Sequence, residues 1–355
     1  MKDMPTLIPL KHLTRPQPAV PRAPAGLPTR LVDRFGRIHS NLRISITDRC
    51  NFRCVYCMPE EMEFYPREVI LTYEEIMRLA RIAADLGVDK IRLTGGEPLV
   101  RRDLPVLVRG LDALNRFRDL SLTTNGARLA EMAGELWEAG LRRINVSLDS
   151  LDPGRFAELT RRPLFDAVMR GLEAARSVGF SPIKVNAVAM RGFTEFELLA
   201  FAELAREQCY QVRFIEFMPL DGDNEWDLKQ VLTSQEILDT ISAVYPLERS
   251  SPVGASDPAT VYRFLDGRGE IGIIPTVTEP FCTQCNRIRL TADGKLRHCL
   301  FAVEETDLKT PLRAGATDAE LAWRFVECVE GKWAGHLIPA ANFQKPGRNM
   351  SQIGG

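Results

Sequence analysis

Six of the eight cysteines fall into two groups of three, and these groups are the side chains best suited to chemistry. The groups are Cys50, Cys54 and Cys57, then Cys282, Cys285 and Cys299. Thiolates bind soft metal centres, so each group can hold zinc or an iron–sulfur cluster. A closed site of either kind needs four protein ligands. Each group therefore predicts a metal centre with one position left for another ligand.

The first group lies in the segment CNFRCVYC, directly after a predicted strand. Its spacing of three residues and then two, with Tyr56 before the last cysteine, resembles the signature of radical S-adenosylmethionine (SAM) enzymes. That signature favours an iron–sulfur cluster over zinc. The open iron would bind the amino and carboxylate groups of SAM. One electron from the cluster would then cleave SAM to methionine and a 5′-deoxyadenosyl radical.

The second group leaves two kinds of metal centre open. A zinc site completed by His298 or His336 fits the cysteine spacing. However, Arg287 and Arg289 lie between the second and third cysteines of the group. Guanidinium groups suit an anionic cluster with an anionic substrate more than they suit a structural zinc ion.

The two remaining cysteines, Cys209 and Cys328, lie in helical patterns. Free cysteines in such positions usually behave as small buried apolar residues. We expect neither of them to be a metal ligand.

Strand and helix patterns alternate from residue 41 onward. Strands are predicted at 42–47, 90–94, 120–124, 143–148, 183–189 and 211–217. Helices are predicted between them at 72–86, 129–140, 164–179 and 194–209, with capping boxes at Thr72/Glu75 and Thr194/Glu197. Strands separated by helices imply a parallel sheet. Six such units fall two short of an eightfold barrel, so we expect an α/β fold with an incomplete, TIM-like (β/α)6 barrel; a doubly wound sheet is the alternative.

Polar and apolar residues alternate along these strands. In the first strand Arg43, Ser45 and Thr47 share one face, and Leu42 and Ile44 lie on the other. Parallel strands covered on both faces are usually apolar throughout. We therefore expect a polar, basic cavity on the inner face, suited to a large anionic ligand such as a nucleotide. A solvated antiparallel sheet is the alternative.

The composition excludes several classes of protein. The chain has 355 residues and a formal net charge of −1, which gives no general attraction to nucleic acid or to a membrane surface. No apolar run is long enough to span a bilayer. Residues 1–30 are proline-rich and lack a signal-peptide pattern, so we expect a disordered arm and a cytoplasmic protein.

Five segments together resemble the GTP 3′,8-cyclase family, the A proteins of molybdenum cofactor biosynthesis. They are RISITDRCNFRCVYCMP (43–59), IRLTGGEPLVRRDL (91–104), EFMPL (216–220), EPFCTQCNRIRLTADGKLRHCLF (279–301) and SQIGG (351–355). The resemblance covers about residues 31–355. It implies an incomplete (β/α)6 barrel at 31–220 and a smaller C-terminal iron–sulfur domain at 221–355 that closes the barrel opening.

The resemblance also implies the cofactors and the site. Two [4Fe–4S] clusters would lie at opposite ends of a channel, with SAM on the first and GTP between them. The SAM contacts would be Tyr56, Gly96, Ser147 and Met218. The GTP contacts would be Arg43, Arg92, Thr123, Lys184, Arg287, Ile288 and Arg289. Catalytic roles would fall to Arg287, Arg289 and the C-terminal residues Gly354 and Gly355.

In this family the deoxyadenosyl radical takes the 3′ hydrogen of GTP, and the resulting carbon radical attacks C8 of guanine. An electron and a proton then complete (8S)-3′,8-cyclo-7,8-dihydroguanosine 5′-triphosphate. The expected partners are an external electron donor and the next pathway enzyme, cyclic pyranopterin monophosphate synthase; whether the chain forms a homodimer stays open. A radical SAM enzyme that modifies peptides is the alternative function, and a non-catalytic zinc or electron-transfer protein is the third.

Overall fold

The computed structural model describes residues 26–208, 210–221, 226–250, 256–336, 338 and 343–354. Most of the predicted arm, together with Cys209 and Gly355, lies outside these described residues. Within the described part of the chain, no helix combines the length and the apolar character needed to cross a membrane.

Six parallel strands form the centre of the fold, as the alternating pattern predicts. They are β1 (Asn41–Ser45), β2 (Lys90–Thr94), β3 (Asp119–Thr124), β4 (Arg143–Ser147), β5 (Ile183–Ala189) and β6 (Gln211–Glu216). The predicted bounds differ from these by about two residues at most. The prediction of an incomplete, TIM-like barrel is confirmed.

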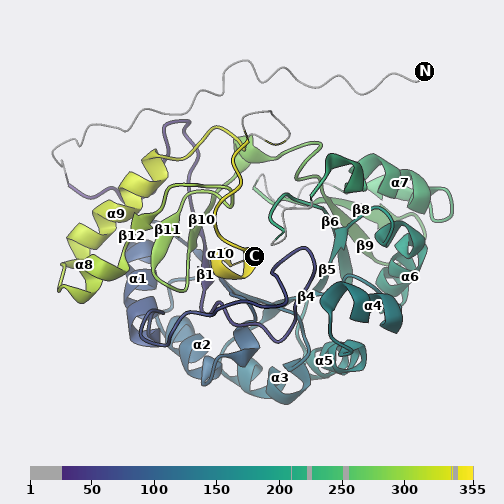
Figure 1. Cartoon of the computed structure of the whole chain (residues 1–355), viewed down its shortest axis with the longest axis horizontal. Helices are drawn as coiled ribbons and strands as arrows, with labels where there is room; N and C mark the ends of the chain where they lie inside the picture. Colours follow the sequence, from purple (N-terminus) through teal and green to yellow (C-terminus); the bar gives the residue numbers. More distant parts are fainter. Residues whose placement is uncertain are drawn as a thin grey trace.

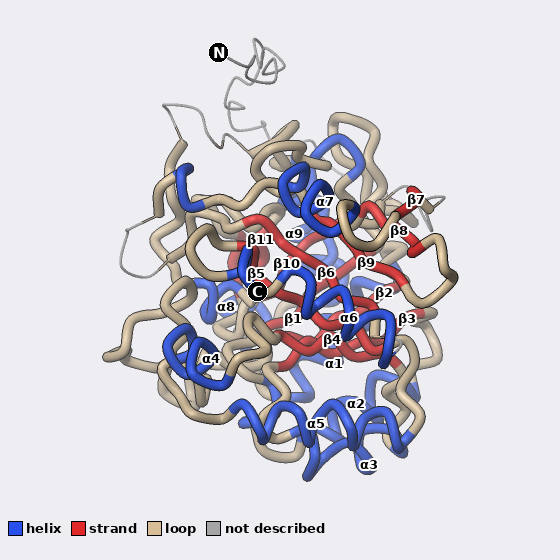
Figure 2. Tube along the Cα trace, turned by 90° about the vertical axis from the view of Figure 1, so that its right-hand side faces the viewer, coloured by secondary structure: helices blue, strands red, loops and turns tan. Residues whose placement is uncertain are grey.

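Helices cover the outer face of this sheet (Figure 1). They are α1 (Tyr73–Asp85), α2 (Leu104–Ala113), α3 (Leu129–Glu138), α4 (Pro153–Thr160), α5 (Phe165–Val178) and α6 (Leu198–Gln208). In the side view of Figure 2, helices α2, α3 and α5 lie together along one side of the strands. The apolar strand residues pack against this layer, and Leu42, Ile44 and Leu93 are completely buried there.

The strands of the C-terminal part extend the same sheet at both edges. They are β7 (Leu247–Arg249), β8 (Thr260–Phe264), β9 (Glu270–Ile274), β10 (Arg287–Leu290), β11 (Lys295–Arg297) and β12 (Thr306–Asp307). β10 pairs in parallel with β1, and β9 pairs in parallel with β6. The 12-stranded order is β12-β11-β10-β1-β2-β3-β4-β5-β6-β9-β8-β7. Because β12 and β7 are not paired with each other, the barrel stays open.

The remaining helices lie in the C-terminal part. They are α7 (Ser234–Ser242), α8 (Lys309–Arg313), α9 (Asp318–Glu330) and the short α10 (Met350–Ile353), with the 3₁₀ turns η3 (Leu228–Gln230) and η4 (Cys282–Gln284). Two further 3₁₀ turns, η1 (Pro98–Val100) and η2 (Thr194–Phe196), follow β2 and β5. α9 packs on α1 and α7 packs on α6. α10 lies at the centre of the barrel in Figure 1, close to the C-terminal end of the described chain.

One predicted capping box is confirmed and the other is wrong. Thr72 caps α1, and the Glu75 carboxylate accepts from the Thr72 amide at 2.8 Å. Thr194 instead begins η2, and α6 begins only at Leu198. The Glu197 carboxylate accepts from the backbone amide of Leu151 at 2.5 Å, so it stabilises the loop after β4 rather than a helix start.

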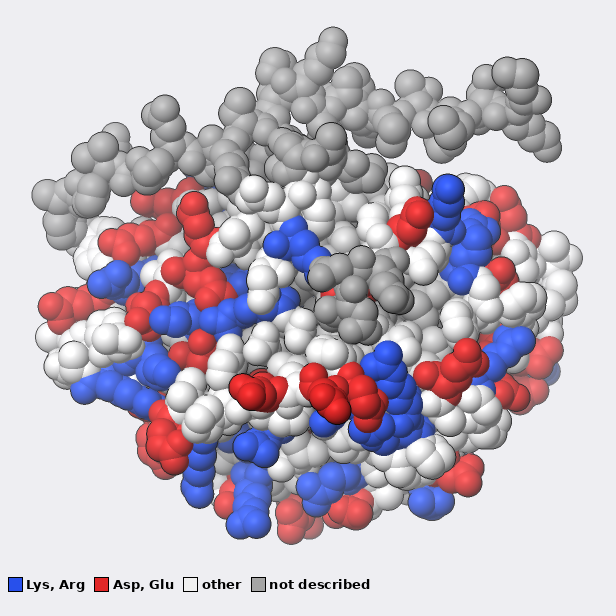
Figure 3. Space-filling view, viewed as in Figure 1, with Lys and Arg blue, Asp and Glu red and all other residues white. Residues whose placement is uncertain are grey.

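The described face seen in Figure 3 carries lysine and arginine side chains interspersed with aspartate and glutamate side chains. Neither sign forms a continuous surface on that face. The mixture agrees with the near-neutral net charge of the chain.

Candidate active site

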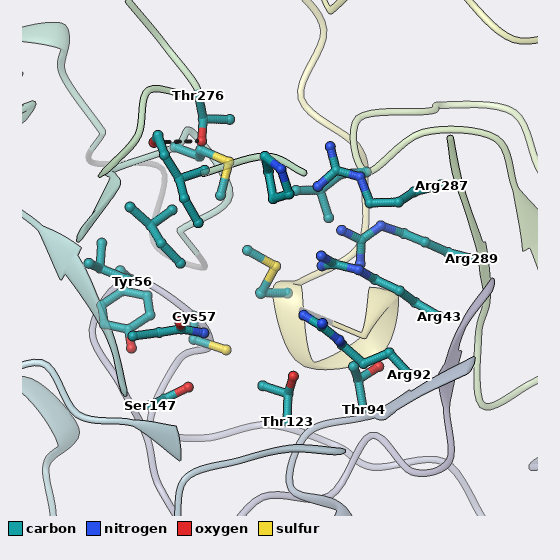
Figure 4. A pocket seen from close by; sticks show the side chains of 18 of the residues that line it. Arg43, Tyr56, Cys57, Arg92, Thr94, Thr123, Ser147, Thr276, Arg287 and Arg289 are labelled. Carbon is teal, nitrogen blue, oxygen red and sulfur yellow. Dashed lines mark hydrogen bonds between the residues drawn. The ribbon is translucent and has the colours of Figure 1, made fainter. Parts of the chain in front are cut away.

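Both cysteine groups line the same cavity. It has a volume of ≈ 290 Å³, and its lining includes all six of the cysteines predicted to be metal ligands. Polar residues from alternate positions of the inner strands also line it, namely Arg43, Arg92, Thr94, Thr123, Ser147, Asn186 and Arg213. The polar face of the sheet thus surrounds the cavity. Figure 4 shows Tyr56, Cys57 and Ser147 on one side and the arginines on the other.

The first cysteine group lies in the loop that follows β1. This loop is fixed to the end of α4, because the amides of Arg53 and Val55 donate to backbone carbonyls there at 3.0 Å each. The Cys50 sulfur accepts from the Phe52 amide at 3.4 Å and from the Asn125 side-chain amide at 3.8 Å. These contacts hold the sulfur toward the cavity without providing it with a charged partner.

Burial makes the first-group thiols weak acids. It raises the pKa of Cys50 from 9.0 to about 12, with the Glu97 carboxylate adding to the effect. Burial likewise raises the pKa of Cys57 to about 12 and that of Cys54 well above 9.0. The thiols therefore keep their protons in the ligand-free chain, and metal binding must release them.

Two glycines let the strand β2 lie directly against the cysteine loop. A Cβ atom on Gly95 would lie 2.6 Å from the Thr47 carbonyl oxygen, and one on Gly96 would lie 2.4 Å from that of Arg49. The Gly96 and Glu97 amides donate to these two carbonyls at 2.7 and 2.8 Å. The glycines thus position the loop as well as lining the cavity.

The two carboxylates nearest the first group are already fully engaged. Glu97 accepts from the Thr124 hydroxyl at 2.6 Å and from the backbone amides of Asn125 and Leu99. Asp149 accepts from the Tyr56 hydroxyl at 2.5 Å and from the Val188 amide at 2.8 Å. Neither carboxylate is placed as a fourth metal ligand, so the three thiols fit a cluster with one open position.

The Asp149 contact also orients the Tyr56 ring. Burial raises the pKa of the Tyr56 hydroxyl well above 10.0, and the neighbouring Asp149 carboxylate adds to this shift, so the hydroxyl donates its proton. Tyr56, Gly96, Ser147 and Met218, the residues expected to contact SAM, all line the cavity.

Two cationic side chains contact a sulfur atom of the second cysteine group. Cys282 begins η4, Cys285 directly follows it, and Cys299 follows β11. The Cys285 sulfur accepts from the Lys332 ammonium at 3.6 Å and from the Arg287 guanidinium at 3.7 Å. Burial opposes ionisation of this thiol, but the two cations outweigh it and lower its pKa from 9.0 to about 6.

The two histidines considered as a fourth zinc ligand at the second group differ in their contacts. Both ring nitrogens of His336 are bonded to backbone, to the Thr276 carbonyl at 2.8 Å and the Ile338 amide at 3.3 Å. His298 lines the cavity beside Cys299, its ring packs edge-on against Trp333, and its buried Nδ1 has no hydrogen-bond partner among the described residues.

Strand register brings three arginines side by side. Arg43 of β1 is paired with Arg92 of β2 and with Arg289 of β10. Burial lowers the pKa of Arg92 to about 10 and that of Arg289 to about 9, and for Arg289 the neighbouring Arg287 adds to the shift. Adjacent buried cations repel one another, so this row is suited to a ligand with several negative charges.

The C-terminal tail reaches this row. The Gly354 carbonyl oxygen accepts a hydrogen bond from the Arg289 guanidinium. Gly354 has a φ of +79°, and a Cβ atom there would lie 2.6 Å from Thr94 Oγ1. Only glycine fits this position without strain. Gly355, also expected to act in catalysis, lies outside the described residues.

Three predicted positions need a more exact description. Ile288 is completely buried in the hydrophobic core, so only its backbone can face a ligand. Lys184 is half-buried near Arg213 and does not itself line the cavity. Cys328 is buried, as expected, and it does not belong to the cavity lining.

Sequence reasoning missed Lys332 and the Asp33–Arg37–His39 cluster. Arg37 donates to the Cys282 and Ala334 carbonyls at 2.7 and 2.9 Å, and its Nε contacts Asp33 at 2.6 Å. This cluster therefore holds the chain before β1 against the second cysteine group. Its residues are isolated charges in an irregular segment, so no local pattern indicates the role.

Comparisons with known proteins agree with this arrangement. Residues 44–205 match the Radical SAM superfamily model, and residues 210–338 match the Molybdenum Cofactor Synthesis C model. A GTP 3′,8-cyclase of Rhodopirellula baltica is 49% identical over 344 residues, covering 93% of this chain and 95% of its own length. The chain belongs to the GTP 3′,8-cyclase family.

A second sequence relative and one solved structure are also similar to this chain. A GTP 3′,8-cyclase of Moorella thermoacetica is 48% identical, covering 91% of this chain and 99% of its own. The solved structure of Streptococcus suis SuiB bound to S-adenosylmethionine has a TM-score of 0.55 at 15% identity, covering 74% of this chain and 61% of that chain. The latter likeness concerns the fold alone.

Membership of the radical SAM superfamily implies a [4Fe–4S] cluster and SAM. The first cysteine group fits this requirement, since its three thiols face a shared cavity and the adjacent carboxylates are engaged elsewhere. Tyr56 and Cys57 lie next to each other on one side of the cavity (Figure 4).

Proposed function

We propose that this chain converts GTP to (8S)-3′,8-cyclo-7,8-dihydroguanosine 5′-triphosphate, the first step of molybdenum cofactor biosynthesis. The observation that supports it best is the shared cavity, which joins two three-cysteine groups and a row of buried arginines. Relatives that are 48% and 49% identical carry the name GTP 3′,8-cyclase. A peptide substrate would not need several adjacent cations in the cavity wall.

The proposal assigns a second [4Fe–4S] cluster to Cys282, Cys285 and Cys299. Their sulfurs line the cavity, and the cations at Cys285 favour its thiolate form. Both ring nitrogens of His336 are bonded to backbone, which leaves it poorly placed to complete a zinc site. The open position of this cluster would face the guanine of GTP.

The two walls of the cavity would bind different ligands, SAM on one side and GTP on the other. Tyr56, Gly96, Ser147 and Met218 would hold SAM beside the first cluster. The triphosphate would bind Arg43 and Arg92, which line the cavity, and would extend toward Lys184 beside Arg213. Thr123 and the backbone of Ile288 would lie nearby, and Arg287 and Arg289 would orient the base and sugar. When bound, the reduced first cluster and SAM supply the 5′-deoxyadenosyl radical that removes the 3′ hydrogen of GTP.

The tail would complete the site. Gly354 already contacts Arg289, so Gly354 and Gly355 would lie next to the bound nucleotide and exclude water from it. We also propose residues 31–220 and 221–355 as the two domains, although their strands share one sheet. The partners would be an external electron donor and the synthase that consumes the product, in the cytoplasm; a homodimer remains to be tested by sedimentation.

The experiment is anaerobic reconstitution with iron and sulfide, followed by reduction in the presence of SAM and GTP. We expect two clusters per chain, 5′-deoxyadenosine and the cyclised nucleotide, all measured by metal analysis and mass spectrometry. Cys50→Ala should abolish 5′-deoxyadenosine formation. Cys328→Ala is the matched control, because this buried cysteine does not line the cavity. A fully loaded protein that cleaves SAM but leaves GTP uncyclised would refute the proposal.

A further inference from the structure

Lys332 is a buried lysine whose contacts are with backbone carbonyls and a sulfur atom. It follows α9, and only 3% of it is exposed. Its ammonium donates to the carbonyl oxygens of Arg287 and His298, both at 2.7 Å. Its third contact is the Cys285 sulfur at 3.6 Å. Among the described residues, no carboxylate forms an ion pair with this ammonium group.

Such a position is costly unless an anion is present. Removing an ammonium group from water costs several kcal/mol, and neutral carbonyls compensate only part of that. Lysine is almost never fully buried without a paired charge. In the part of the chain that the structure describes, the sulfur of Cys285 is the only hydrogen-bond partner of Lys332 that can carry a negative charge. The site is therefore built around an anionic centre at Cys285.

The ammonium is also fixed in place. Arg287 opens β10, His298 follows β11, and Lys332 itself follows α9, so three parts of the chain meet at this nitrogen. The two short carbonyl contacts leave little freedom for the side chain to move away. The positive charge thus stays at a constant distance from the second cysteine group.

The two cysteine groups differ in the side chains and amides that contact their sulfur atoms. The Cys50 sulfur accepts from two uncharged groups, the Phe52 amide and the Asn125 side chain. The second group instead has the cations Arg287 and Lys332 in contact with a sulfur atom. Net charge and hydrogen bonds to sulfur are the main factors that set the reduction potential of an iron–sulfur cluster.

We propose that Lys332 is a fixed positive charge that raises the reduction potential of the second cluster. Reduction adds one negative charge to a cluster, and a nearby cation stabilises that charge. This inference rests on the proposed cluster at Cys282, Cys285 and Cys299. Its consequence is that an electron is held more favourably at the second group than it would be without this lysine.

The test is a redox titration of the full-length protein followed by electron paramagnetic resonance. The background variant carries Cys50→Ala, Cys54→Ala and Cys57→Ala, so that only the second cluster gives a signal. Lys332→Met removes the charge and keeps the length of the side chain, whereas Lys332→Arg keeps the charge. Lys309→Met is the matched control, because the Lys309 ammonium also donates to a backbone carbonyl, that of Val69 at 2.7 Å, but away from the cysteines.

We expect Lys332→Met to lower the equilibrium constant for reduction at least tenfold, a shift of about −59 mV for a one-electron couple. Lys332→Arg should recover most of the wild-type potential, and Lys309→Met should leave it unchanged. An unchanged potential in Lys332→Met, with iron and sulfide content intact, would overturn the inference while leaving the second cluster established.

Two other outcomes, loss of the cluster from the Lys332 variants and its absence from the background variant, have different meanings. If Lys332→Met fails to hold its cluster, Lys332→Gln replaces it, because the amide can still donate to the neighbouring carbonyls. Loss of the cluster in both would show that Lys332 is needed for assembly and would also overturn the inference. Absence of iron and sulfide from the background variant itself would instead refute the second cluster and hence that part of the proposed function.

Discussion

The Arg348 guanidinium donates two hydrogen bonds of 2.9 Å, one to each carboxylate oxygen of Asp293. The same guanidinium contacts Glu305 at 2.7 Å and the Tyr65 hydroxyl at 3.0 Å. Asp293 lies in the turn between β10 and β11, and Arg348 lies just before α10. This contact therefore fixes the tail to the strand that carries Arg289, the partner of Gly354.

Arg348→Met is expected to release the tail and slow cyclisation about tenfold or more. Loss of a mostly buried bidentate pair costs about 2 kcal/mol or more, which favours the undocked tail by roughly 30-fold. The measurements are the rate of product formation and the rate at which carboxypeptidase shortens the chain. Arg348→Lys should restore part of both.

The control for this variant is Arg116→Met, which removes a half-exposed pair with Asp85. Exposed ion pairs of this kind contribute little to stability. Equal carboxypeptidase sensitivity of Arg348→Met and the wild type would show that Arg348 does not hold the tail.

Gly354→Ala is expected to impair cyclisation through local strain alone. The residue has a φ of +79°, and the added methyl group would lie 2.6 Å from Thr94 Oγ1 and 2.8 Å from Ser45 Cβ. Either effect costs on the order of 1 kcal/mol or more, so we expect a loss of about tenfold in the cyclisation rate with unchanged cluster content. The readout is product formation under single-turnover conditions.

Gly347→Ala supplies the comparison within the same tail. No atom lies within 4 Å of the position that its Cβ would occupy. It should therefore behave as the wild type does. If both alanine variants were fully active, the docked position of Gly354 would have no part in the reaction.

Local patterns were sufficient to predict most of the barrel. The alternation of Arg43, Ser45 and Thr47 with Leu42 and Ile44 depends only on neighbouring residues, and so does the Thr72–Glu75 capping box. Thr194–Glu197 has the same local pattern but a different structure. There the amide of Leu151 competes for the carboxylate, and the sequence gives no sign of a contact between residues so far apart.

The candidate metal ligands of the site could be predicted from the sequence, but most of the contacts that hold them in place could not. The cysteines and Arg287 stand out by spacing and charge, whereas the pairing of Arg43 with Arg289 joins strands from opposite ends of the chain. Lys332 follows an amphipathic helix, where a lysine is normally solvated. Its burial results from packing of the segment after α9 over β10 and β11, which only the tertiary structure shows.

Arg287→Met is expected to separate SAM cleavage from cyclisation. Arg287 lies over the Phe281 ring at 4.5 Å and contacts Cys285, on the wall opposite Tyr56 (Figure 4). Loss of a hydrogen bond from a charged group costs about 1.5–3 kcal/mol, so cyclisation should fall by roughly 10- to 100-fold. Formation of 5′-deoxyadenosine should fall much less, because the SAM side of the cavity is unchanged.

The ratio of the two products decides the role of Arg287. Arg263→Met is the control, since Arg263 pairs with Glu270 at the outer edge of the sheet and is mostly exposed. A parallel loss of 5′-deoxyadenosine and cyclised nucleotide in Arg287→Met would count against a role confined to the substrate.

Binding of GTP is expected to weaken as the pH rises above about 8. Burial, and then the neighbouring Arg213, lower the pKa of Lys184 from 10.5 to about 8 in the ligand-free chain. A bound triphosphate favours the protonated lysine, so above this pKa binding must take up a proton. The affinity should therefore be highest below pH 8 and fall by up to about tenfold per pH unit above it.

The dissociation constant of GTP, measured by equilibrium dialysis at constant ionic strength from about pH 7 to about pH 9.5, tests this dependence. The terminal phosphate is already ionised over most of that range, so the ligand contributes little. Lys184→Met should bind GTP more weakly at pH 7 and lose the fall in affinity that begins near pH 8, whereas Lys309→Met should follow the wild type. A fall that still begins near pH 8 in Lys184→Met would assign the titration to another group.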